Sequence, residues 1–213
     1  MNNGLITFII VTWNNEKQIE ACLESLTQYT TVSHEIIIVD NVSRDRTCDI
    51  IARKYPLVQL IKSKENLGFA RGNNVALKKV RTPYVCFINP DVILTEDITL
   101  PAINILNQYE NVGLVTNKLC NSDGSNQLTT GRFTDLVSIL VSVCHLSLFI
   151  PNPLRKDLCP EYYKIKNGVF FPDWVIGAEM FMRTSDAKKL VVFRQIIICI
   201  WKIWIYVGKY GIN

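Results

Sequence analysis

Short apolar runs alternate with amphipathic segments in the amino-terminal part of the chain. Four runs are continuous enough to be buried strands, and they cover residues 8–11, 36–39, 58–61 and 84–88. Apolar residues at helical spacing lie between them, at Ile19, Cys22, Leu23 and Leu26 and again at Phe69, Ala76, Leu77 and Val80. Ser43 to Asp45 can cap a further helix that runs to about Lys54. This alternation predicts an α/β fold with βαβ units and a mostly parallel sheet covered by helices on both faces.

Polar side chains follow three of the four predicted strands. They are Thr12, Trp13 and Asn14 after the first, Asp40, Asn41, Ser43 and Asp45 after the second, and Asn89 and Asp91 after the fourth. Local turn and cap preferences explain Asn14 or Ser43 taken singly. Ligands of open α/β sheets bind beyond the carboxyl ends of the strands. The set as a whole, with Asp40 and Asp91 both at such ends, therefore predicts a binding site.

A glycine-containing segment at residues 66–74 lies between the third strand and a helix. Its glycines allow close backbone approach, and its helix start offers N–H groups to a nucleotide or an anion. The segment is not G-x-G-x-x-G and does not follow the first strand, which excludes a dinucleotide-binding fingerprint. The chain also lacks G-x-x-x-x-G-K-[ST], which excludes the P-loop NTPases.

Four motifs in this order resemble those of family 2 glycosyltransferases. They are IIVTWN at 9–14, IVDNVSRD at 38–45, NLGFARGNN at 66–74 and FINPD at 87–91. The third and fourth are most similar to rhamnosyltransferase-like members, and DWVIGA at 173–178 resembles the acceptor-side strand of the family. The resemblance covers the chain from about Thr7 to Leu190. It implies the GT-A fold, with a Rossmann-like sheet.

The resemblance also implies a role for each matching position. Asp40 would hydrogen-bond the base or ribose of the donor nucleotide, and residues 66–74 would line a uridine or thymidine pocket. The implied donor-binding residues are Thr12, Asn14, Asp40, Asn41, Asp45, Asn66, Gly68, Asn73 and Asn89. The implied acceptor-side residues are Trp174, Gly177 and Ala178.

A divalent metal ion, Mg²⁺ or Mn²⁺, is the implied cofactor. Asp91, the last residue of a degenerate D-x-D, would help to hold it on the donor diphosphate. A hard cation prefers oxygen ligands and usually takes one or two carboxylates while phosphates supply the rest. Asn89 replaces the first acid of the usual D-x-D, so Asp91 is the single carboxylate of this motif.

The general base that inverting family members place in an E-D-x-D-like segment is absent. Residues 191–213 contain no carboxylate side chain. A shifted reading frame, in which each new codon starts at the third nucleotide of the old one, gives acidic residues in this region. In that frame the codons for Trp201–Lys202 encode Glu and those for Trp204–Ile205 encode Asp, which resembles the missing motif. We therefore hypothesise that the gene has lost one nucleotide near the codons for Lys189 and Leu190. We accordingly assign no residue after Leu190 as the catalytic base.

This hypothesis divides the chain into three parts. Residues 1–118 form a sugar-nucleotide-binding half, residues 119–190 form an acceptor-side half of the same domain, and residues 191–213 are an out-of-frame tail. An apolar stretch at 136–150 is expected to be a core or interfacial helix, with peripheral membrane contact as one role.

Charge, cysteine spacing and the amino-terminal sequence indicate which partners and which cellular compartment to expect. The formal net charge of +4 comes from dispersed Lys and Arg, so no nucleic-acid partner is expected. The seven cysteines have no C-x-x-C spacing and are expected to be buried, reduced thiols. The amino terminus has no signal-peptide pattern, which predicts a cytoplasmic protein that acts at the inner face of the membrane when its acceptor is lipid-linked.

These inferences predict an inverting glycosyltransferase of surface polysaccharide synthesis. It would move a sugar, with rhamnose as a candidate, from dTDP-rhamnose or a UDP-sugar to a saccharide or lipid-linked acceptor. Two alternatives stay open: a catalytically inactive fragment or pseudoenzyme that at most binds a sugar nucleotide, and a related α/β nucleotidyltransferase. The nucleotidyltransferase would need a glycine-rich, lysine-containing loop after the first strand, and residues 12–16 lack it.

Overall fold

The computed structural model describes most of the amino-terminal half of the chain and a shorter carboxyl-terminal part. The described residues are 5–117, 119–121, 124–125, 127, 130–131, 172, 174–189 and 204–208. The chain forms two compact units, one of residues 1–115 with 177–198 and one of residues 116–176 with 199–213. The first unit contains the sheet that carries most of the predicted site.

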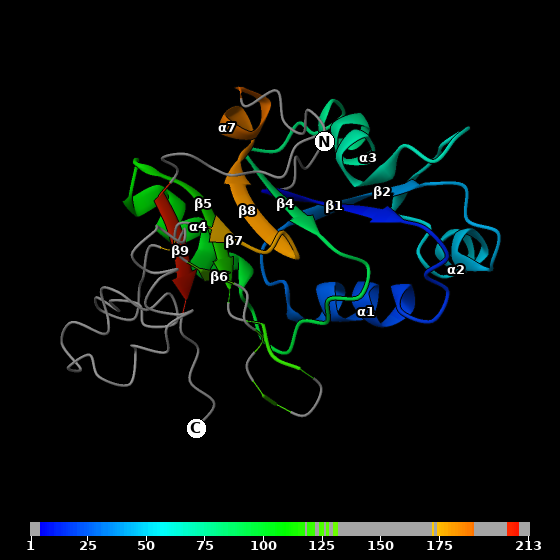
Figure 1. The fold of residues 1–213 in the computed structure, drawn as a ribbon, viewed down its shortest axis with the longest axis horizontal. Helices are drawn as coiled ribbons and strands as arrows, with labels where there is room; N and C mark the ends of the chain where they lie inside the picture. The colour runs from blue at the N-terminus through cyan, green and yellow to red at the C-terminus, as the bar shows by residue number, and fades with distance from the viewer. Residues whose placement is uncertain are drawn as a thin grey trace, which may run out of the picture. The chain divides into compact units, whose positions relative to one another are not determined.

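The sheet of the first unit is mostly parallel, as the sequence pattern predicts. Its strands are β1 (Ile6–Thr12), β2 (His34–Asp40), β3 (Gln59–Lys62), β4 (Tyr84–Ile88), β5 (Val112–Asn117) and β8 (Glu179–Arg183). They lie in the order β3-β2-β1-β4-β8-β5. β1 pairs in parallel with β2 and β4, and β2 pairs in parallel with β3, whereas β8 runs antiparallel to β4 and β5. Figure 1 shows β8 beside β4, although about ninety residues separate them along the chain.

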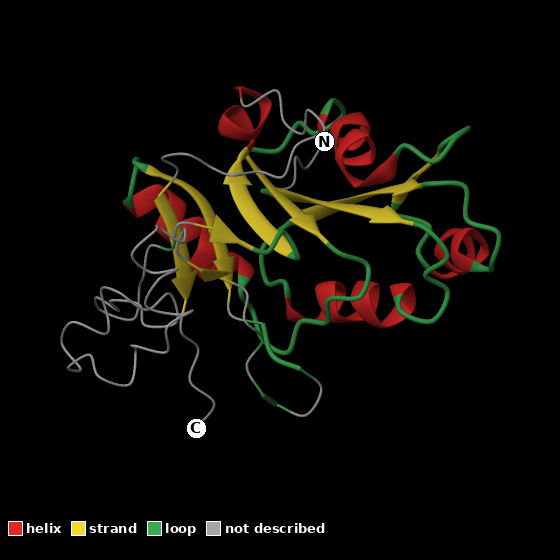
Figure 2. Ribbon diagram, in the orientation of Figure 1, coloured by secondary structure: helices red, strands yellow, loops and turns green. Residues whose placement is uncertain are grey.

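Helices cover both faces of this sheet. They are α1 (Ile19–Tyr29), α2 (Thr47–Lys54), α3 (Gly68–Leu77), α4 (Thr99–Gln108) and α7 (Thr184–Lys189). α1 and α3 lie on opposite faces of the strands (Figure 2). The predicted α/β architecture with helices on both faces is therefore confirmed.

The apolar face of α1 lies in the core, as its spacing predicts. Its four predicted apolar positions, Ile19 among them, are fully buried. On the sheet, Phe8 and Phe181 are buried and meet edge to face, with ring centroids 6.5 Å apart. Burial of these side chains is the main stabilising term for this unit.

The helix face predicted for α3 is correct at three positions and wrong at one. Ala76, Leu77 and Val80 are buried, but the side chain of Phe69 is 43% exposed. The reason is that α3 begins at Gly68, whose carbonyl accepts a hydrogen bond from Asn41 just beyond the end of β2. The first turn of the helix thus lies past the end of β2, where the described residues cover Phe69 only in part.

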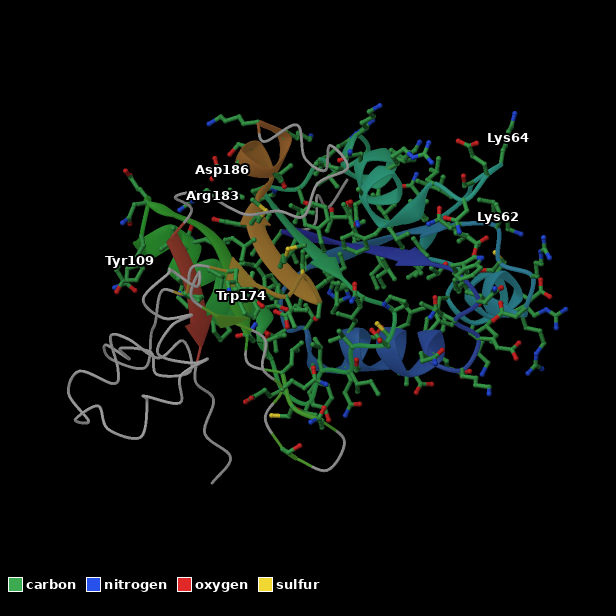
Figure 3. All side chains as sticks on the ribbon, in the orientation of Figure 1. Lys62, Lys64, Tyr109, Trp174, Arg183 and Asp186 are labelled. Carbon is green, nitrogen blue, oxygen red and sulfur yellow. The ribbon has the colours of Figure 1, made fainter. Side chains whose placement is uncertain are left out.

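Arg183, at the end of β8, braces the turn between α4 and β5. Its guanidinium donates to the carbonyl oxygens of Val112 at 2.7 Å and Tyr109 at 3.0 Å, and also to that of Leu106. Asp186 accepts from the same group at 3.2 Å, and the two side chains lie close together in Figure 3. The brace satisfies carbonyls at the end of α4 that have no partner inside the helix.

The described part of the second unit contains short strands. β6 (Thr130–Gly131) pairs antiparallel with β7 (Trp174–Val175), and β9 (Trp204–Gly208) lies within the predicted tail. The predicted helix at 136–150 and the rest of 191–213 lie outside the described residues. No helix within the described ranges is long and apolar enough to cross a membrane.

Candidate functional site

The predicted site lies where the carboxyl ends of β1, β2 and β4 meet. Thr12 and Asp40 are register partners at the ends of β1 and β2. β1 has β2 on one side and β4 on the other, so the connections from β1 and β4 leave in opposite directions across the sheet. Ligands of open α/β sheets bind at such a switch point, beyond the carboxyl ends of the strands.

Asp40 is the most buried acid of the predicted donor set, with a side chain only 3% exposed. Its Oδ1 accepts a hydrogen bond from the Thr12 hydroxyl at 3.2 Å, and its Oδ2 accepts from the Ser43 N–H at 3.0 Å. A carboxylate can accept about four hydrogen bonds, so acceptor capacity remains for a ligand. The structure brings Thr12 and Asp40 together as predicted.

Cys48 is a neighbour of Asp40 that the sequence analysis treated only as a reduced thiol. Burial, and then a hydrogen bond to Asp40, raise the pKa of the Cys48 thiol to about 11. The thiol is therefore protonated at neutral pH and acts as a donor to the carboxylate. Its position one residue into α2, after the polar loop, is the only sequence signal that it lies here.

Asn41 joins the end of β2 to the segment at 66–74. Its Oδ1 accepts from the Leu67 N–H at 3.2 Å, and its Nδ2 donates to the Gly68 carbonyl at 3.3 Å. Gly68 has a left-handed backbone, with φ of 68°, and its N–H donates to Oδ1 of Asn66 at 2.8 Å. These contacts bring Asn41, Asn66 and Gly68 into one cluster.

Gly72 lets α3 approach β1 closely. A Cβ at this position would lie 2.9 Å from Cγ1 of Val11 and 3.7 Å from Nδ2 of Asn41. Asn73 is 1% exposed, and its side-chain amide donates to the carbonyl of Phe69 one turn earlier, at 2.9 Å. Asn73 thus stabilises the first turn of α3 from within the helix.

The loops after β1 and β2 are tied to each other. The Asn14 N–H donates to Oγ of Ser43 at 2.9 Å, and Oδ1 of Asn14 accepts from the Arg44 N–H at 2.8 Å. Trp13 lies on the first loop with 58% of its side chain exposed. An exposed tryptophan at the edge of a polar cluster offers a flat apolar surface to a ligand ring.

Asp45 anchors the second loop. Its Oδ2 accepts from the Glu16 N–H at 3.0 Å, and its Oδ1 accepts from the N–H and the hydroxyl of Thr47. Burial acts to raise the pKa of Asp45, but the hydrogen bonds from Thr47 and Glu16 outweigh it and hold the pKa below its ordinary value. Asp45 thus bonds the first N–H of α2, whereas Arg46, the residue directly before the helix, makes no side-chain cap.

The turn that carries Asp91 lies against the start of β8. The Asn89 N–H donates to the carbonyl of Ala178 at 2.8 Å, and the Asn89 carbonyl accepts from the Val92 N–H at 3.2 Å. Asp91 itself is exposed. Ala178, predicted for the acceptor side, is therefore next to the predicted metal turn, and Gly177 precedes it.

Glu179 is a buried acid at this turn that the sequence analysis missed. It pairs with Ile88, the last residue of β4, and its side chain is 1% exposed. Burial, and then the charge of Glu179, raise the pKa of the Cys86 thiol well above its ordinary value. A charged residue that opens the apolar run Met180–Met182 was the signal available in the sequence.

Two predicted features remain outside this cluster. Trp174 belongs to the second unit, where it is half-buried and pairs with Gly131, and Asp173 lies outside the described residues. Within the described ranges, no group of three or more His, Cys, Asp or Glu side chains could hold a metal ion. Among the described residues of this turn, Asp91 is the carboxylate that a metal ion could use, and oxygens of the ligand would supply further positions.

A groove of about 1000 Å³ lies at the opposite edge of the sheet. It is lined by α1, the end of α2 and the amino ends of β2 and β3, and includes Glu20, Glu24 and Tyr55. Burial, and then the charges of Glu24 and Glu20, raise the pKa of Tyr55 to about 12. None of the predicted site residues lines this groove, so the chemistry points to the carboxyl edge instead.

The chain is similar in sequence and in fold to known proteins. Residues 7–170 match the family model described as Glycosyl transferase family 2. The poly(ribitol-phosphate) beta-N-acetylglucosaminyltransferase TarS of Staphylococcus aureus (strain MW2) is 25% identical over 185 residues, which are 84% of this chain and 31% of TarS.

Two solved structures have a similar fold. S. aureus TarS 1-349 in complex with UDP-GlcNAc has a TM-score of 0.59 at 20% identity, over 95% of this chain and 55% of that one. The mannosyltransferase PcManGT from Pyrobaculum calidifontis, in complex with GDP-Man and Mn²⁺, has a TM-score of 0.60 at 15% identity, over 98% of this chain and 57% of that one. The chain spans less than two thirds of the length of each of these proteins.

Proposed function

Since the chain belongs to glycosyltransferase family 2 and has the GT-A fold, we propose that it binds a nucleoside-diphosphate sugar and transfers the sugar to an acceptor hydroxyl. The observation that carries the proposal is the cluster at the carboxyl edge, in which Asp40 is buried and held by Thr12 and Ser43. Asn41 ties this cluster to the segment at 66–74. Such a cluster offers oriented acceptors and an apolar surface, as a nucleoside requires.

The donor nucleotide would lie across the ends of β1 and β2. Asp40 and its neighbours Thr12, Asn14, Asn41 and Asp45 would bind the base and ribose, with Trp13 offering a stacking surface. Gly68 and Asn73 of α3 would approach the donor together with Asn66, which precedes the helix, and Asn89 would approach from the end of β4. TarS 1-349 was solved with UDP-GlcNAc, which supports a UDP-sugar, whereas the motif variants support dTDP-rhamnose as the second candidate.

The diphosphate would lie near Asp91, together with Mg²⁺ or Mn²⁺. The single exposed carboxylate fits a hard cation that takes most of its ligands from phosphate and water. When bound, the cation would stabilise the charge that develops on the departing nucleoside diphosphate. The solved structure of PcManGT is a complex with GDP-Man and Mn²⁺, which supports a metal-assisted donor site in this chain as well.

Transfer would form a bond between the acceptor oxygen and the anomeric carbon and break the bond to the diphosphate. The diphosphate would keep the bonding electron pair, and the acceptor proton would pass to a base. We propose an inverting reaction on a saccharide or lipid-linked acceptor in surface polysaccharide synthesis, at the inner face of the membrane, with Trp174, Gly177 and Ala178 on the acceptor side. TarS, whose name describes transfer to poly(ribitol-phosphate), supports a polymeric acceptor that carries hydroxyl groups.

The alternative is a fragment that binds the donor without turnover. The tail at 191–213 has no carboxylate side chain to act as the base. Loss of a general base typically lowers the rate about 10² to 10⁴-fold. We therefore propose that restoring the reading frame after Lys189 restores transfer. Sequencing the gene across these codons tests the premise, and the absence of an acidic E-D-x-D segment in every frame would remove it.

Calorimetric titration tests the donor site directly. The 213-residue chain is titrated with dTDP-rhamnose and with UDP-sugars in the presence of Mg²⁺, and the Asp40→Asn variant serves as the control. We expect binding of one donor class by the parent chain and a strong loss in the variant. A folded sample that binds neither donor would refute the proposal.

A further inference from the structure

Val42 has a left-handed backbone, with φ of 65°. This region is unfavourable for all residues except glycine because Cβ approaches the neighbouring carbonyl, and it is worst for a β-branched side chain. Asparagine, as at Asn14 with φ of 56°, tolerates it better. Val42 is therefore the most strained backbone position on this edge of the described sheet.

Hydrogen bonds on both sides impose this conformation. The side chain of the preceding residue, Asn41, bonds to the backbone of Leu67 and Gly68. The following residue, Ser43, donates its N–H to Asp40 and accepts from the Asn14 N–H. Because both neighbours are fixed, the peptide units around Val42 cannot relax to a right-handed turn without breaking contacts of the site.

The side chain of Val42 gains little from this arrangement within the described chain. It is 39% exposed, whereas the last three aliphatic residues of β2, Ile37 to Val39, are buried. Backbone strain that is not offset by burial of the side chain is typical of binding sites. The residue lies two positions after Asp40, on the loop that is tied to the loop of Trp13.

We propose that Val42 is a donor-binding residue whose isopropyl group contacts the nucleoside part of the donor. The left-handed turn aims the branched side chain toward the ligand, where it forms an apolar wall beside the acceptors of Asp40. The proposal rests on the donor site proposed above. A nucleoside offers a matching surface, because its base is flat and largely apolar on its faces.

Three variants separate the contact from the strain. Val42→Gly removes both the side chain and the strain, and Val42→Ala removes the two methyl groups but keeps a Cβ in the left-handed turn. Leu57→Ala is the control, because Leu57 is 98% exposed and precedes β3 at the other edge of the sheet. Each variant is measured by thermal unfolding and by calorimetric titration with UDP and with dTDP in the presence of Mg²⁺.

We expect opposite effects of Val42→Gly on stability and on binding. The melting temperature should rise by about 2 to 4 °C, because relief of left-handed strain outweighs the added freedom of the unfolded glycine. The nucleotide Kd should rise about tenfold, the effect of removing one partly buried aliphatic contact. Val42→Ala should raise the Kd about fivefold with little change in melting temperature, and Leu57→Ala should change neither.

Two outcomes would overturn the inference while leaving the donor site in place. If the parent chain binds a nucleotide and both Val42 variants bind it equally well, the side chain makes no contact. If Val42→Ala binds like the parent and only Val42→Gly is weakened, the turn conformation matters and the isopropyl group does not. If the folded parent chain binds neither nucleotide, the proposed function and this inference fail together.

Discussion

Replacing Gly72 with alanine tests the close contact between α3 and β1 on which the site depends. The new Cβ would lie 2.9 Å from Cγ1 and 3.1 Å from Cγ2 of Val11, whereas carbon atoms pack best at about 3.5 to 4.0 Å. Val11 cannot simply rotate away, because a β-branched side chain has restricted χ1. Either α3 or the end of β1 must therefore shift.

The magnitude follows from two opposing terms. Overpacking of this kind costs about 1 to 3 kcal/mol, while alanine is favoured over glycine in a helix by about 1 kcal/mol. The net loss is about 1 kcal/mol, which lowers the melting temperature of a chain of this size by about 2 to 4 °C. The shift also moves the start of α3 away from Asn41, so donor affinity should fall together with stability.

Thermal and urea unfolding of a double-mutant cycle measures the coupling. In a Val11→Ala background the clash disappears, and Gly72→Ala should then stabilise the chain by about 1 kcal/mol. Ala52→Gly, at an exposed position of α2, measures the helix-propensity term in the same chain. If Gly72→Ala already stabilises the chain with Val11 present, the packing argument is wrong.

Three further predictions concern single side chains. Asp40→Asn can accept only one of the two hydrogen bonds from Thr12 and Ser43, so we expect a stability loss of about 1 to 3 kcal/mol by urea unfolding and at least a tenfold weaker donor affinity by calorimetry. Arg183→Met removes the side-chain donor to the carbonyls of Leu106 and Val112 and one of the two donors to that of Tyr109, so it should cost about 1 to 3 kcal/mol in urea, with the donor Kd unchanged. The pKa of Asp45 is lowered on folding. Its contribution to the free energy of unfolding is therefore complete above about pH 4 and is lost as the pH falls through the folded pKa. Acid unfolding should therefore begin at higher pH in the parent chain than in Asp45→Asn, once both curves are normalised to neutral pH.

The parallel part of the sheet could be predicted from the sequence because its strands are continuous apolar runs. The exact strand ends could not, since polar residues extend them: Thr7 lies on β1 before the predicted run and is buried because its hydroxyl bonds to that of Thr82 at 2.7 Å. The prediction that Phe69 lies on the buried face of α3 was wrong for a related reason. Helical spacing identifies a stripe of residues, but it does not show how far the sheet beneath that stripe extends.

The acids and amides of the site were predictable for a different reason, which is that they directly follow strands. Asp40 and Asn41 show this at the end of β2. Cys48 and Glu179 were missed because their contacts depend on tertiary pairing. No local pattern indicates that Glu179 would lie opposite Ile88, about ninety residues away. The roles of the individual donor residues stay predictions until a ligand is bound.

The position of β8 has a consequence for synthesis of the chain on the ribosome. β8 lies between β4 and β5, so both strands lack this neighbour until residue 183 has been made. The amino-terminal sheet therefore cannot be completed by the first 118 residues alone, and a nascent chain that pauses there would expose an unpaired strand edge. Loss of a nucleotide near the Lys189 codon would lie after the codons for β8 and α7. The whole donor-side sheet would then still be encoded in frame.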